Sequence, residues 1–302
     1  MHRLRPAGLS LACIVAGQAS AHTVASGENG GWSLDPIIAT LIVLSSLLQV
    51  VGWRRLGRAR ATIAPPWRIA AYCGVVATLV LALFSPLDAR ADDSFAWHMG
   101  QHLLLMLVAA PLLALSNAHF VALFALPRAW RQPVGRWIGH APGAGAGARH
   151  RGGPWLAALA FTAGLWLWHA PVLYEAALAH RAVHTLEHLV FLFTAAVFWR
   201  MVITAGNRRL SLPSAVVLVT LVGLQGNLMA ALITLAPAPL YSSYAGPGGL
   251  LDQQEAGLLM WVPAGLIYLA STFWTLHKLM SAPSRARSGL LVVPSTRTHR
   301  SG

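Results

Sequence analysis

The chain has 302 residues, of which 56% are hydrophobic and 10% are charged, and its mean hydropathy is +0.58. Soluble domains carry about 25% charged residues, so this composition excludes an ordinary soluble domain and favours a lipid bilayer as the solvent. A net charge of +13 would indicate a nucleic-acid partner in a soluble protein. Here the basic residues lie between long apolar segments, and no nucleic-acid partner is expected.

The first 21 residues have the pattern of a secretory signal peptide. Arg3 and Arg5 form a positive region, Leu9 to Ala16 is a short apolar core, and Ala19-Ser20-Ala21 is an A-x-A cleavage site. Cleavage after Ala21 would leave a mature N-terminus at His22, outside the cytoplasm. Residues 22–33 would then form a short periplasmic segment.

Seven segments are long and apolar enough to cross a bilayer, which takes about 20 residues. They predict an all-α fold, a polytopic membrane bundle of seven transmembrane helices over residues 34–280. The connection at about 116–153 is expected to be a flexible cytoplasmic loop, and residues 281–302 a basic cytoplasmic tail. The predicted spans are 34–53, 67–87, 95–115, 154–174, 185–204, 212–236 and 254–276.

The charges predict the orientation of the bundle. Eighteen of the 22 basic residues lie in alternate loops and in the C-terminal tail, which are expected in the cytoplasm by the positive-inside rule. The mature N-terminus is therefore expected outside and the C-terminus inside. All nine acidic residues lie at the opposite, outer ends of the spans. Either simple segregation of the few acidic residues or attraction of a cation would explain this clustering. A functional role is expected only for Glu187 and Asp252.

Two histidine pairs lie at the predicted outer ends of the third and fifth spans. His98 and His102 form one H-x3-H pair, and His184 and His188 form the other. Residues four apart lie on the same face of a helix. Ionisable groups inside a span are costly, usually face the bundle interior and often mark function. The two pairs therefore predict a metal or haem site near the outer surface.

Three further polar residues share this depth: His169, Glu187 and Asp252. The carboxylates are expected either as ligands or as acceptors that fix imidazole tautomers. Imidazole suits copper, zinc, iron and nickel, and the nearby thioethers of Met99 and Met106 favour Cu(I). Copper is therefore the expected metal, with zinc or haem as alternatives. The predicted metal-site residues are His98, His102, His169, His184, Glu187, His188 and Asp252.

Four motifs occur in order on consecutive outer ends: HMGQHLLLMLVAAPLLALS, WHAPVLYEAAL, HTLEHLVFLFTAAVFW and DQQEAGLLMWVPAG. Over roughly residues 34–280 the chain resembles the polytopic, caa-type cytochrome c oxidase assembly factor family CtaG. The resemblance implies a plasma-membrane protein needed to build an active haem–copper oxidase, with a role in copper delivery, and it matches all seven predicted site residues to the family's recurrent positions. A Gly/Ala/Arg-rich stretch at 141–153 departs from the family pattern.

The resemblance also implies the cellular context. A multi-pass protein of the bacterial inner membrane is expected, with its metal site facing the periplasm and no enzymatic activity. The expected partners are the lipid bilayer, haem–copper oxidase subunits and a periplasmic copper chaperone.

Three other functions stay open from the residues alone. Histidines on different helices could be axial ligands of a b-type haem. A copper permease would use the same ligands. His184, Glu187 and His188 also match the short inverted zinc motif H-x-x-E-H of metalloproteases, in which the glutamate activates a zinc-bound water.

Overall fold

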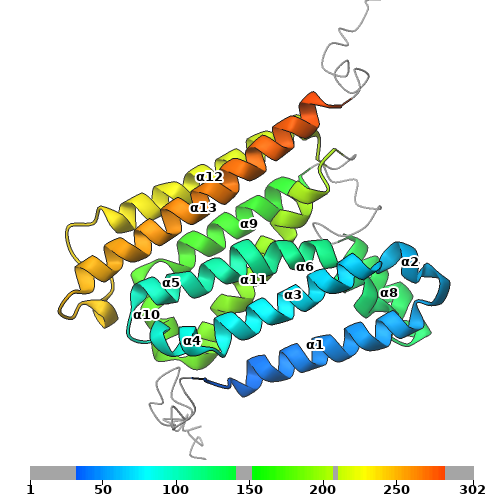
Figure 1. Cartoon of the computed structure of the whole chain (residues 1–302), viewed down its shortest axis with the longest axis horizontal. Coiled ribbons are helices and arrows are strands. Elements are labelled where there is room, and N and C mark those ends of the chain that lie inside the picture. Colours follow the sequence, from blue (N-terminus) through cyan, green and yellow to red (C-terminus); the bar gives the residue numbers. More distant parts are fainter. Residues whose placement is uncertain (1–31, 141–151, 207–209, 283–302) are drawn as a thin grey trace, which may run out of the picture.

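The computed structural model describes residues 32–140, 152–206 and 210–282. The predicted signal peptide, most of the periplasmic segment, most of the Gly/Ala-rich stretch and nearly all of the basic tail lie outside these residues. Within the described ranges every regular element is a helix, as predicted (Figure 1).

In the described part of the chain, six helices are long and apolar enough to cross a membrane, and a bent pair could provide a seventh. The bent pair is α9 (Gly153–Trp168) and α10 (Pro171–Ala179), with 74° between them. The prediction of seven spans therefore holds only if this pair counts as one. Five of the six are single helices: α1 (Pro36–Arg55), α3 (Pro66–Leu83), α11 (Arg181–Ile203), α12 (Leu212–Thr234) and α13 (Gly249–Met280). The remaining one consists of three consecutive elements, α5 (Phe95–Leu103), η2 (Leu104–Ala109) and α6 (Ala110–Ser116).

The chain following α6 is helical up to residue 140, so the expected flexible loop is wrong for residues 118–140 apart from short links. It contains α7 (Ala118–Ala125) and α8 (Arg128–His140). The run Ala118–Ala125 is almost wholly apolar, and it packs against α1. The backbones approach closely there, because a Cβ atom added to Gly52 would lie 2.0 Å from the carbonyl oxygen of Val121. Packing against α1 therefore stabilises helical structure in a segment that the sequence predicted to be part of a flexible loop.

The third span widens into the π-helical segment η2, which begins two residues after His102. Pro111 has no N–H and disrupts the preceding turn, and the Ala110 N–H bonds to the Leu105 carbonyl instead of the regular partner. In π-helical geometry the Met106 carbonyl would accept a hydrogen bond from the backbone N–H of residue 111. Pro111 has no N–H, so this carbonyl has no partner within the helix. The indole N–H of Trp199 on α11 donates to that carbonyl at 2.9 Å. The widened turn, a feature frequent at functional sites, is thereby tied to α11.

The beginnings of α1, α5, α11 and α13 meet at one end of the bundle (Figure 1). Asp35 at the start of α1 contacts Arg181 at the start of α11, and Asp252 in α13 contacts Ser94 before α5. The short helices α4 (Pro86–Ala91) and η3 (Ser242–Tyr244) lie at this end, and η1 (Gly57–Ala59) and α2 (Arg60–Ile63) follow the far end of α1. The orientation of this end in a membrane stays a prediction.

Candidate metal centre

Four histidines from two helices converge inside the bundle. His98 and His102 are the fourth and eighth residues of α5, and His184 and His188 are the fourth and eighth residues of α11. One ring nitrogen from each lies within 4.8 Å of the others. All four side chains are buried, with between 0% and 5% of their surface exposed. The two predicted pairs therefore face each other across the helix interface, and we call these residues the four-histidine cluster.

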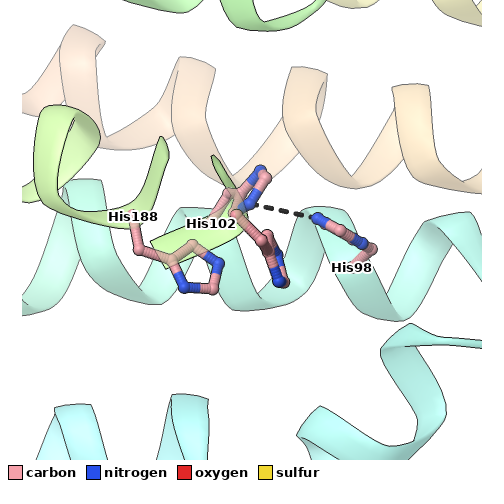
Figure 2. A group of neighbouring side chains, drawn as sticks. His98, His102 and His188 are labelled. Carbon is pink, nitrogen blue, oxygen red and sulfur yellow. Dashed lines mark hydrogen bonds between the residues drawn. The ribbon is translucent and has the colours of Figure 1, made fainter. Parts of the chain in front are cut away.

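The spacing of the nitrogens suits a small ion. The Nε2 atoms of His98 and His102 are 3.2 Å apart, and their rings point toward each other with His188 beside them (Figure 2). Two imidazoles bound tetrahedrally with metal–nitrogen bonds of about 2.0 Å have their nitrogens about 3.3 Å apart. The nitrogens of His98 and His102 are thus already at the spacing of two ligands of one ion. The nitrogens that are farthest apart, within 4.8 Å of each other, would have to approach by at most about 1.5 Å through rotation of the rings.

Tyr244 sets the tautomer of His98. The Tyr244 hydroxyl donates its single proton to the carbonyl of Ala91 at 2.8 Å, so toward His98 Nδ1, 3.2 Å away, it acts as an acceptor. His98 then carries its proton on Nδ1, which leaves the Nε2 lone pair directed at the cluster. Burial raises the pKa of Tyr244 above its ordinary value, so the hydroxyl stays protonated.

Changing Tyr244 to phenylalanine tests this arrangement. The ring packing is kept, but the Nδ1–H of His98 loses its acceptor, and the Nε2–H tautomer becomes competitive. Loss of an outer partner of a metal ligand typically costs 10–100-fold in metal affinity, and we expect a loss of about tenfold or more. Competition between the purified protein and a Cu(I) chelator measures it. An unchanged affinity would show that Tyr244 has no part in orienting the ligand.

Glu187 adds a buried carboxylate to the cluster. Its side chain is fully buried, its Oε1 is 3.9 Å from His102 Nε2, and neither carboxylate oxygen has a hydrogen-bond partner among the described residues. The Nδ1 atom of His102 is buried without such a partner as well. An ionised carboxylate in an apolar interior is costly unless a cation or a proton balances it. A metal cation held by the imidazoles would supply that balance, so the residues present fit a metal ion.

His169 lies beside the cluster and outside the group of four. It follows α9 at the bend before Pro171, and its Nδ1 donates to the Leu165 carbonyl at 2.8 Å. Its Nε2 is buried and without a hydrogen-bond partner in the described structure. The ring of Phe191 is a neighbour of both His102 and His169, with its centroid 4.8 Å from that of the His102 ring and 6.1 Å from that of the His169 ring. His169 is not among the four histidines whose nitrogens converge.

Asp252 is not brought to the cluster. Its carboxylate accepts hydrogen bonds from the Ser94 hydroxyl at 2.7 Å and from the backbone N–H groups of Phe95 and Ala96 at 2.6 and 3.2 Å. It therefore caps the N-terminus of α5 from the neighbouring α13, where a negative charge is favoured. The expected role as ligand or tautomer-fixing acceptor gives way to a role in holding the helix that carries His98 and His102.

The sequence prediction missed several residues around the cluster. Gln101 is fully buried and donates from Nε2 to Asp88 at 2.7 Å and to the Ala82 carbonyl at 2.8 Å. A glutamine inside an apolar span was a signal that could have identified it. Tyr244 gave no such signal, because it reaches His98 from the loop between α12 and α13.

Together, these features define a multi-helix membrane protein with a buried histidine and carboxylate cluster near one end of its bundle. The family model described as cytochrome c oxidase caa3 assembly factor (Caa3_CtaG) matches residues 47–282, and the chain belongs to this family. The resemblance read from the four motifs is thereby confirmed. No curated protein and no solved structure matches the chain.

Proposed function

We propose that this oxidase assembly factor binds one copper ion at the four-histidine cluster and passes it to a nascent haem–copper oxidase subunit. The observation that carries the proposal is the convergence of four buried imidazoles within 4.8 Å, beside a buried carboxylate that has no hydrogen-bond partner among the described residues. Imidazole nitrogens bind copper well. Family membership supplies the client, a cytochrome c oxidase.

The geometry favours a small ion over haem. A haem takes axial histidines on opposite faces of a flat macrocycle. Here the ring centroids of His184 are 4.1 Å from His188 and 5.0 Å from His98, and those of His98 and His102 are 4.5 Å apart. Rings in such mutual contact leave no room for a macrocycle within these three pairs.

The burial of the cluster favours transfer over proteolysis. A zinc protease needs a metal with an open position and a substrate groove beside the general base. Glu187, the base in the H-x-x-E-H interpretation, is fully buried between two transmembrane helices. We therefore propose a non-enzymatic role. The cluster also lies within the first two turns of α5 and α11, at one end of the bundle, which supports exchange at one surface over permeation through the membrane.

The charge pattern supports a periplasmic location for this end in the bacterial inner membrane. Arginines lie in the last turns of α1 and α11, as Arg54, Arg55 and Arg200 do, and the positive-inside rule places such ends in the cytoplasm. A periplasmic copper chaperone would then deliver the ion from the aqueous side, and the oxidase subunit would take it from the same end of the bundle.

A deletion strain tests the proposed function. We expect oxidase activity and the copper content of the purified oxidase to fall together, with haem still incorporated, because only copper supply is interrupted. Excess copper in the medium should restore part of the activity. Oxidase activity, visible haem spectrum and copper analysis are the measurements. Normal activity in the deletion strain would refute the assembly role, and a copper-replete but inactive oxidase would refute copper delivery.

A further inference from the structure

Within the described part of the chain, two cavities touch His188 of the buried cluster. The first is small, about 20 Å³, and lies at the end of the bundle where α1 and α11 begin; it also touches His184. The second is a groove of about 870 Å³ that runs along α11 between α1, α3, α6 and α7. Because the four histidines are almost fully buried, an ion needs a path through the packed interior, and these two spaces are the candidates among the described residues.

The chemistry of the walls separates the two routes. The groove is lined mainly by aliphatic side chains, so a cation there would leave water for a largely apolar wall. Apart from the end at Thr185 and His188, its polar lining residues are Ser45, Gln49, Tyr72, His119 and Arg200. The small cavity has Leu34, Ile38 and Leu83 in its wall, but most of its lining residues are polar, with Ser33, Asp35, Asp88, Arg181 and Thr185 beside the two histidines. Its volume is enough for one water molecule or one metal ion. The polar cavity is therefore the favourable route for a cation.

Its polar residues lie at successive depths. Asp35 and Arg181 form an ion pair with Oδ2 and Nε 2.7 Å apart, and their side chains are 12% and 28% exposed. Asp88 is buried, and it accepts hydrogen bonds from Ser33 and Gln101. Gln101 directly precedes the cluster residue His102. An ion moving inward would meet the ion pair first, then the Asp88 carboxylate, then the histidines.

We propose that this small polar cavity is the port through which copper reaches and leaves the four-histidine cluster, closed at rest by the Asp35–Arg181 ion pair, with Asp88 as the carboxylate that receives the ion. This inference rests on the proposed copper-binding function and adds its path. Asp35 and Arg181 act on the rate of exchange, because they lie outside the cluster. The affinity at equilibrium belongs to the histidines.

The test uses the full-length protein in lipid nanodiscs, loaded with Cu(I), and follows transfer to a chromogenic chelator by stopped flow. Asp35→Asn keeps Oδ1, which caps α1 through the N–H groups of Ile37 and Ile38, and it removes the charge that holds Arg181. Arg181→Gln removes the other charge. A partly exposed ion pair contributes at most about 1 kcal/mol, so we expect loading and release each to be about fivefold faster.

Two comparisons make the result specific to the port. The double variant is expected to be no faster than either single variant, because the pair acts as one unit. Glu175→Gln removes a carboxylate at the same end that bonds to Ser242 and Ser243 and does not line the cavity. This control is expected to leave both rates unchanged. Asp88→Asn is expected to slow loading, because the ion loses its first buried ligand.

The outcomes separate this inference from the proposed function. If the wild-type protein binds no Cu(I), the proposed function fails and the port fails with it. If it binds Cu(I) but the ion-pair variants exchange at the wild-type rate, only the port is refuted. A faster release matched by a proportional loss of affinity would also refute it, because the variants would then have distorted the cluster.

Discussion

Replacing His98 and His188 together with alanine is expected to abolish copper binding. The variant removes one ligand from α5 and one from α11, so neither helix keeps its i,i+4 pair. Loss of an outer partner alone costs up to about 100-fold in affinity, and loss of two ligands is expected to exceed that. Equilibrium titration with a Cu(I) chelator should show about one ion per wild-type chain and none on the variant.

A double variant of His180 and His277 provides the matched control. Both side chains are exposed and outside the cluster, and His180, although it precedes α11, makes no capping hydrogen bond through its side chain. The control should bind copper as the wild type does, and circular dichroism should show equal helix content for all three proteins. Undiminished copper binding by the His98 and His188 variant would refute the site.

The convergence of the two histidine pairs could be predicted because sequence fixes both the face and the depth of each pair. Residues four apart share a helix face at any rotation of the helix. Both pairs start at the fourth residue of their helices, and both helices begin at the same end of the bundle. The depth of each pair, and the fact that its two members share one helix face, could therefore be predicted from sequence. What sequence could not supply was the rotation of each helix about its axis.

Asp252 illustrates this limit. It lies at the predicted depth, but α13 turns it toward the start of α5 and away from the imidazoles. His169 likewise stays outside the group of four, at the 74° bend between α9 and α10, where its ring neighbours Phe191. Both outcomes depend on tertiary packing, which a pattern within one helix does not encode.

The segment after the third span shows a second limit, in the assignment of loops. Composition and the Gly/Ala-rich stretch indicated a loop across residues 116–153, although the first part is a short apolar run. That run is too short to span a bilayer, so a search for spans discards it. In the structure it forms α7 and packs on α1 at Gly52. Short helices that pack along a span are hidden from a test based on length.

Replacing Glu187 with glutamine is expected to change metal affinity and stability in opposite directions. The change keeps the shape of the side chain and removes its charge. A copper ion held by neutral imidazoles leaves a positive charge in an apolar interior, and the carboxylate 3.9 Å from His102 Nε2 balances it. We expect copper affinity to fall about 10–100-fold, as for other groups that support metal ligands.

Without metal, the same substitution removes a buried ionisable group that has no hydrogen-bond partner among the described residues. Burying such a group is costly, so the metal-free variant should be at least as stable to heat as the metal-free wild type. Thermal unfolding with and without Cu(I) measures both effects on one protein: copper should raise the unfolding temperature of the wild type more than that of the variant. If the variant lost stability without metal and kept its copper affinity, Glu187 would be a structural residue, and charge balance would have to come from elsewhere in the bundle.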